Sequence, residues 1–215
     1  GRRRRVRFCP SLGLFFVLWH VATEWDLAFY VRFQNIPTPA QVLAEAIDLF
    51  GTGGFYVHIL ASLERIWLGF AIASVSGIGL GLLIGWFSFA EDTLFPPIEL
   101  LRPIPAVAWV PLSIMLWPTE RSSIVFITAL GAFFPIVLNT IHGVESIDRQ
   151  LVRAATSLGA GRAAIFREVV IPGALPSIVT GLSVGMGVSW LCLISAEMIS
   201  GQFGVGYFTW VAYGI

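Results

Sequence analysis

The sequence contains no lysine, and all 13 of its basic residues are arginine. A phosphate-binding loop needs a glycine-rich turn that ends in lysine followed by serine or threonine. The chain therefore lacks such a loop, and a separate subunit must hydrolyse ATP if ATP drives its function. We predict that this chain is not itself an enzyme.

Charged residues are also scarce. They make up 12% of the 215 residues, whereas 56% are hydrophobic, and a typical soluble domain has about 25% charged residues. The mean hydropathy of +0.82 places the chain among membrane proteins. The formal net charge is zero, so no basic field of the kind that attracts nucleic acid is present.

Residues that bind metals or act as nucleophiles are few and scattered. The two cysteines, Cys9 and Cys192, lie far apart without metal-ligand spacing, and we interpret them as buried thiols. The three histidines, His20, His58 and His142, are isolated from one another, and no spacing of nucleophile and base stands out. The sequence predicts no catalytic residues, no metal site and no cofactor.

Five apolar stretches predict an all-α fold, a polytopic bundle of transmembrane helices, because about 20 apolar residues span a bilayer. The stretches cover residues 8–30, 63–89, 98–118, 122–141 and 173–200. The first is the weakest, and its basic start also fits a signal peptide. No small-residue cleavage site follows Ala22, so we interpret residues 1–35 as a basic N-terminus and a first span.

Residues 36–62 are expected to form a periplasmic amphipathic segment. A helix that starts at Thr38 or Pro39 and ends at Phe50 suits a membrane surface, with an apolar face of Val42, Ala46, Ile47 and Phe50. A turn is expected at residues 51–54, and a loop at Glu91-Asp92 and Pro96-Pro97. Residues 63–215 form the predicted core transmembrane domain, which contains a polar loop at residues 142–172.

Small residues follow one face of the second predicted span. They recur every four residues, at Ala73, Gly77, Gly81 and Gly85. In lipid such a stripe allows another helix to approach closely. This pattern predicts helix packing and carries no functional specificity.

Three prolines, Pro103, Pro105 and Pro111, interrupt the third predicted span. Broken backbone at membrane depth often lines a transport cavity, although a plain packing kink is the alternative. Glu197, the only acid in the fifth span, is a candidate for function or for a structural hydrogen bond, and we expect it near the outer end, within reach of water. The candidate translocation path comprises Pro103, Pro105, Asn139, Ser183, Ser189 and Glu197.

The arginines predict the orientation of the chain. With a cytoplasmic N-terminus, five arginines of residues 2–7 and four of the loop at 142–172 lie inside. Three others, Arg32, Arg65 and Arg121, then lie outside. This distribution satisfies the positive-inside rule.

Residues 148–172 are predicted to form two short helices, at about 148–158 and 162–170, around a glycine break. Asp148 is favourable at a helix N-terminus, Gly159 can end a helix in the left-handed conformation, and Pro172 is expected to end the polar stretch. Ala154, Ala155 and Leu158, expected to be exposed, suit a docking surface. The alternative is a solvated amphipathic loop on the inner leaflet.

This loop resembles the coupling motif of importer permeases in the ATP-binding-cassette (ABC) superfamily. The motif reads Glu-Ala-Ala, three residues, Gly, nine residues, Ile-x-Leu-Pro. The chain has Arg153-Ala154-Ala155, then Gly159, then Val169-Val170-Ile171-Pro172 with the same spacing. The resemblance implies an ATPase-coupling role for Arg153, Ala154, Ala155, Leu158, Gly159, Val169, Ile171 and Pro172. Arg153 replaces the usual acid, so a different charge pairing is expected.

Residues 37–213 resemble the nitrate/sulfonate/taurine branch of these permeases. The stretches that carry the resemblance include Arg102-Pro103-Ile104-Pro105, Ala196-Glu197-Met198 and Gly204-Val205-Gly206-Tyr207. The resemblance implies the type I ABC importer permease fold in the plasma (inner) membrane. It also implies an ATPase subunit, a second permease copy and a substrate-binding protein as partners. Family members usually have a further span, so we expect a sixth after this sequence.

The substrate stays open, with nitrate, sulfonate, taurine and bicarbonate among the candidates. A secondary transporter or channel that works without an ATPase is the alternative function. It predicts internal repeats, which we do not find in the sequence. A membrane scaffold without transport activity is a third possibility.

Overall fold

Helices account for all the regular structure in residues 2–24 and 36–213, the parts of the chain that the computed structural model describes. The predicted all-α fold is therefore confirmed. The chain divides into two compact units, Gly1–Tyr56 and Val57–Ile215, and each is described by itself.

The first unit contains α1 (Arg2–Glu24) and α2 (Pro39–Gly51). Thr38 caps α2 with a reciprocal pair of hydrogen bonds, since its hydroxyl accepts from Gln41 N and its own N–H donates to Gln41 Oε1 at 2.9 Å. The predicted start of this helix is confirmed, and its place on a membrane surface stays a prediction. The described apolar part of α1, Gly13–Glu24, is shorter than a span, and the expected extension to Tyr30 lies outside the described residues.

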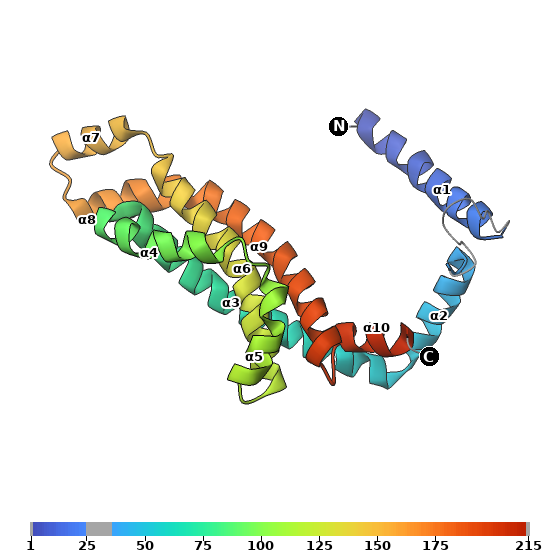
Figure 1. The fold of residues 1–215 in the computed structure, drawn as a ribbon. Helices are drawn as coiled ribbons and strands as arrows, with labels where there is room; N and C mark the ends of the chain where they lie inside the picture. Colours follow the sequence, from blue (N-terminus) through green and yellow to red (C-terminus); the bar gives the residue numbers. More distant parts are fainter. Residues whose placement is uncertain (1, 25–35, 214–215) are drawn as a thin grey trace. The chain divides into compact units, whose positions relative to one another are not determined.

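Three helices of the second unit are long and apolar enough to cross a membrane, and they lie side by side in Figure 1. They are α3 (Gly53–Trp86), α6 (Glu120–Glu145) and a continuous helix that consists of α8 (Arg162–Ile165), the π-helical turn η3 (Phe166–Val170) and α9 (Ile171–Ser200). These three correspond to the second, fourth and fifth predicted spans. Because α3 starts at Gly53, most of the turn expected at 51–54 is helical, and the domain boundary expected at residue 62 falls inside α3.

The third predicted span is a bent element. It consists of α4 (Ser88–Leu101), the 3₁₀ turn η2 (Ala106–Trp109) and α5 (Val110–Leu116), and the helices meet at 85°. The break at Pro103 and Pro105 is confirmed, whereas Pro111 fits the first turn of α5. The loop expected at Glu91-Asp92 and Pro96-Pro97 is wrong because these residues lie within α4. The φ angle of proline is close to the helical value, so each proline removes a hydrogen bond without here ending the helix.

The small-residue stripe packs α3 closely against α6. A Cβ atom added at Gly77 would lie 2.9 Å from Ile136 Cγ2, and one added at Gly81 would lie 2.5 Å from Thr140 Cβ. Helix α9 also packs closely on α6, where an added Cβ at Gly181 of α9 would lie 2.8 Å from Asn139 Cβ. The predicted close approach of helices is therefore confirmed, with α6 in contact with both α3 and α9.

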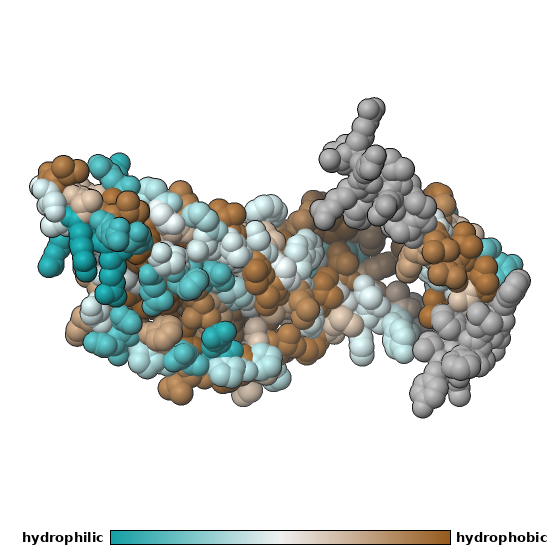
Figure 2. All heavy atoms as spheres, turned by 90° about the horizontal axis from the view of Figure 1, so that it is seen from above, coloured by the Kyte–Doolittle hydropathy of each residue, from teal (hydrophilic) through white to brown (hydrophobic). Residues whose placement is uncertain are grey.

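Short helices complete the two ends of this unit. The helix α7 (Arg149–Ser157) connects α6 to α8, and α10 (Val205–Tyr213) follows α9. Figure 2 shows strongly hydrophilic residues gathered at the end that carries α7 and α8, and hydrophobic residues mixed with residues of intermediate hydropathy along the middle of the helices. The segment that follows α9 thus contains a helix.

Candidate functional site

The helix α7 is capped at both ends by residues that the sequence singled out. Asp148 Oδ1 accepts a hydrogen bond from Gln150 N at 2.8 Å. At the other end Gly159 has φ +85°, its N–H donates to Thr156 O, and the N–H of Ala160 donates to Ala155 O. These two bonds form a Schellman motif. The predicted glycine-terminated helix is confirmed.

One face of α7 packs on the bundle and the other is open. Val152 and Ala155 pack against the core around Val144, Ile165 and Val170. Arg153, Ala154 and Leu158 are exposed, and Leu158 has 89% of its surface accessible. The expectation that Ala155 is exposed is therefore wrong, because its place three residues after Val152 puts it on the packed face.

The second half of the loop continues directly into the span. Val169 and Ile171 are half-buried, and Pro172 is exposed in the first turn of α9. The helix runs from Arg162 to Ser200. The expectation that Pro172 separates a second short helix from the fifth span is wrong, since proline is tolerated where the π-helical turn passes into α9. Movement of α7 would consequently act on the start of a single long helix.

A cavity of about 520 Å³ opens where α4 breaks from η2. The break contributes Arg102, Ile104 and Pro105, and η2, α6 and α9 form the remaining wall. Asn139 of α6 also lines the cavity, and its Nδ2 donates to Pro135 O at 2.8 Å. The structure therefore brings together two candidates for the translocation path, Pro105 and Asn139, with Arg102, which sequence reasoning did not include.

The other candidates for the path lie elsewhere. Pro103 lines a neighbouring cavity together with Arg102. Ser183 is exposed and donates to Val179 O, within its own helix. Ser189 is completely buried and donates to Thr128 O of α6 at 3.1 Å. Ser189 thus stabilises helix packing, as the polar groups of membrane helices often do.

Glu197, the sixth candidate, lies at the end of α9 far from α7 along the chain and is 0% exposed. Its carboxylate accepts hydrogen bonds from Ser62 Oγ at 2.8 and 2.9 Å, from Arg65 Nη1 at 2.9 Å and from Gly206 N at 3.0 Å. The expectation that water reaches Glu197 is wrong, because α3 and the segment before α10 enclose it. The structural alternative, a hydrogen-bonded acid, is the one that the structure supports.

Arg65 joins Glu197 to α6. Its second nitrogen, Nη2, lies 3.2 Å from Glu120 Oε1, and Nη1 also donates to Phe203 O. The guanidinium is 8% exposed. Such a burial of charge is stable only when each charge has partners. We call Ser62, Arg65, Glu120 and Glu197 the buried ion network.

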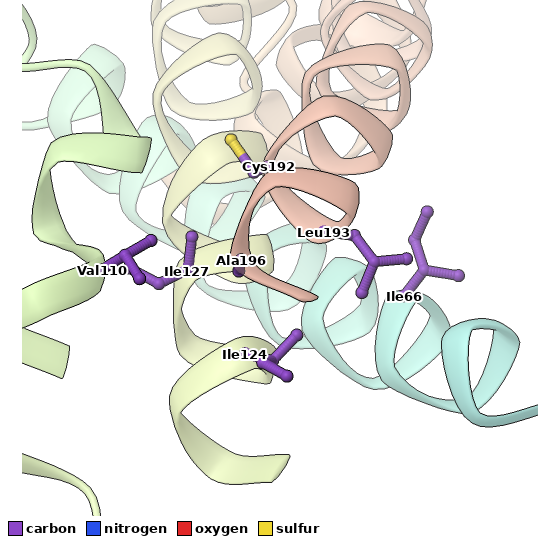
Figure 3. Packing of buried hydrophobic residues seen from close by; sticks show 7 residues of the cluster. All are labelled: Ile66, Val110, Ile124, Ile127, Cys192, Leu193 and Ala196. Atoms are coloured by element: carbon purple, nitrogen blue, oxygen red, sulfur yellow. The ribbon is translucent and has the colours of Figure 1, made fainter. Parts of the chain in front are cut away.

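The buried ion network also holds the segment between α9 and α10. The backbone N–H of Gln202 donates to Glu120, that of Val205 donates to Ser62, and that of Gly206 donates to Glu197. The N–H of Gly204 donates to His58 Nδ1. Gly204 has φ +129°, and a Cβ atom there would lie 2.3 Å from the Glu197 carboxylate. Ile66, the residue after Arg65, belongs to an apolar cluster, and Figure 3 shows Ile66 of α3 near Leu193 of α9. The network therefore closes one end of the bundle.

Comparison with known proteins decides the family. Residues 77–215 match the family described as the binding-protein-dependent transport system inner membrane component. The chain belongs to this family. It is 34% identical to the nitrate import permease NrtB of a Synechocystis strain, over 97% of this chain and 77% of the relative. It is 38% identical to the taurine transport permease TauC of Escherichia coli, over 80% of this chain and 64% of the relative.

The predicted resemblance to ABC importer permeases is thus confirmed, and the chain is a multi-pass membrane permease. The sequence stretches that carried the resemblance meet in this permease: Glu197 contacts the Gly204-to-Gly206 segment. Sequence reasoning did not find that Ser62 and Arg65 contact Glu197, or that Glu120 contacts Arg65. The signal that could have found them is the requirement that a buried acid has a cation nearby, and Arg65 is the only arginine in the second predicted span.

Proposed function

We propose that this permease is the transmembrane subunit of an ATP-driven importer for a small anion such as nitrate, a sulfonate or taurine. The observation that carries the proposal is α7, which has an open face next to a packed face. The names of the relatives NrtB and TauC support the substrate class. The absence of lysine, and hence of a phosphate-binding loop, assigns ATP hydrolysis to a partner subunit.

In this proposal α7 docks on the ATPase. Leu158 and Ala154 supply an apolar contact, and Arg153, which pairs with no described residue, offers its charge to an acid of the partner. Val152 and Ala155 fasten α7 to the bundle core. Because α8, η3 and α9 form one helix, a displacement of α7 is transmitted to the span that lines the cavity.

The family and the distribution of arginines support the rest of the proposed assembly. Two copies of the permease pair in the inner membrane, and a periplasmic or lipid-anchored binding protein delivers the substrate. The arginines of residues 2–7 and of the α7–α8 region support a cytoplasmic location of the N-terminus and α7. The buried ion network, at the other end of α9, then lies toward the periplasm.

A co-purification experiment tests the docking of α7. The permease and its ATPase are co-expressed, and the permease is captured through a tag. Leu158→Asp is expected to lose the ATPase because it places a charge on the apolar contact while it disturbs no packing. Leu43→Asp, the same exchange at an exposed leucine of α2, is the control and is expected to retain the ATPase.

Equal recovery of the ATPase with wild type and Leu158→Asp would show that α7 is not the docking element. The alternative function, a secondary transporter or channel, predicts in addition that the permease alone moves substrate without ATP. No feature of the described residues favours that alternative over the importer.

A further inference from the structure

Arg102 stands at the break between α4 and η2, on the wall of the 520 Å³ cavity. We propose that Arg102 is the binding residue for the transported oxyanion within the membrane domain. This inference rests on the proposed function and specifies a subsite for it. The ligand that Arg102 would bind is a small, singly charged oxyanion, which the binding protein releases into this cavity.

The charge of the cavity points to an anion. Arg102 is its only charged side chain among the described residues that line it, and Asn139 is the main other polar group. The remaining wall is mostly apolar, with residues such as Phe134, Leu138 and Val184. A cation beside apolar walls lacks the charge partner that it would find in a polar site, so an anion that enters is attracted to it.

Arg102 differs from Arg65 and Arg121 in that its guanidinium has no carboxylate partner among the described residues. Arg65 has the carboxylates of Glu120 and Glu197 as partners, and Arg121 pairs with Glu64. The backbone N–H of Arg102 donates to Ile98 O, but its guanidinium forms no hydrogen bond or ion pair with any residue in the described ranges. Glu99 lines the neighbouring cavity together with Arg102, yet no ion pair joins the two. The guanidinium of Arg102 is thus free to bind a ligand.

The form of the guanidinium suits an oxyanion. Its planar fork of N–H donors binds two oxygens of one group at once, which matches the oxygens of nitrate or of a sulfonate. Two prolines that follow it, Pro103 and Pro105, interrupt the helix and keep Arg102 at the break, at the C-cap of α4. The interrupted backbone therefore fixes the position of the Arg102 Cα atom at the break between α4 and η2.

Nitrate uptake into vesicles provides the test. The permease is reconstituted with its ATPase and nitrate-loaded binding protein at saturating concentration, so that capture by the binding protein does not limit the rate. Arg102→Gln is expected to lower the ATP-driven rate at least tenfold. Arg102→Lys, which keeps the charge without the fork, is expected to fall between this variant and wild type, and Arg121→Gln serves as the matched control with a rate near wild type.

A second pair of variants changes the charge of the cavity without changing Arg102. Val184 of α9 lines the cavity and is 49% exposed, so a longer side chain there disturbs little packing. Val184→Glu is expected to lower nitrate uptake at least tenfold, because the carboxylate pairs with Arg102 and repels the anion. Val184→Gln, of nearly the same size and neutral, is expected to stay within threefold of wild type.

Two results would overturn the inference. One is an Arg102→Gln rate within twofold of wild type, and the other is an equal effect of Val184→Glu and Val184→Gln. A lipid phosphate is another oxyanion that an arginine can bind. A defect of Arg102→Gln that disappears in vesicles without anionic lipid would assign Arg102 to a headgroup and also overturn the inference. Failure of the proposed function is distinct, since wild type itself would then show no ATP-dependent uptake.

Discussion

Arg65 Nη1 of α3 lies 2.9 Å from Glu197 Oε1 of α9, and the Glu197 side chain is completely buried. The pair joins two membrane-spanning helices at the end of the bundle that carries α10. Ser62 and the N–H of Gly206 complete the coordination of the carboxylate. Removal of one partner from a buried ion pair leaves the other charge without compensation, which costs more than the pair contributes.

We therefore expect Glu197→Ala to lower the free energy of unfolding by about 3 kcal/mol. The loss follows from the unpaired Arg65 and from the unsatisfied N–H of Gly206. Thermal unfolding of the detergent-solubilised permease measures it. Glu64→Ala is the matched control, because the pair of Glu64 with Arg121 is more than half exposed and such pairs contribute about 0–1 kcal/mol. Similar losses in the two variants would show that burial of the Arg65–Glu197 pair has no energetic consequence.

A second prediction concerns the contact between α3 and α6. Gly81→Ala is expected to destabilise the permease by about 1–3 kcal/mol, the usual cost of an overpacked core, because its Cβ would lie 2.5 Å from Thr140 Cβ. Gly79→Ala, on the same helix, is expected to be neutral or slightly stabilising, since nothing lies within 4 Å of its Cβ. Thermal unfolding distinguishes the two, and loss of stability in Gly79→Ala alone would contradict the packing described.

Gly159 is the third test, because its conformation ends α7. Gly159→Asp is expected to abolish ATP-driven uptake while membrane insertion is kept. The φ of +85° is strained for a residue with a side chain, although a Cβ there would meet no neighbour. The expected loss therefore comes from a displaced α7 and an added charge at the docking surface.

Gly161→Asp controls for the charge. Gly161 also has open space around it, and its φ of −72° suits any residue. This variant is expected to keep most of the uptake. If Gly159→Asp transports as well as Gly161→Asp does, the end of α7 has no role in coupling.

Local patterns predicted much of the fold. The apolar lengths of the second, fourth and fifth spans, the cap at Thr38 and the glycine end of α7 depend on neighbouring residues in the chain, and the structure agrees with each. The spacing of Gly77 and Gly81 likewise predicted a close helix approach. Residues near one another in sequence were sufficient for these features.

Features that depend on partners distant in the chain were not predictable. The burial of Glu197 requires Ser62 and Arg65, which are 135 and 132 residues away in sequence. The cavity likewise requires that the broken third span faces α6 and α9. Proline rules overestimated helix breaks at Pro96 and Pro97, which lie inside α4, and at Pro172, which lies in the helix from Arg162 to Ser200, because the φ angle of proline is close to the helical value.

The central claim is that this permease moves a small anion only when an ATPase is docked on α7. Nitrate uptake into vesicles that hold the permease and loaded binding protein, with and without the ATPase and ATP, tests it most directly. Uptake is expected only when ATPase and ATP are both present, and Leu158→Asp is expected to lose that uptake. Uptake by the permease without the ATPase, or full uptake by Leu158→Asp, would contradict it.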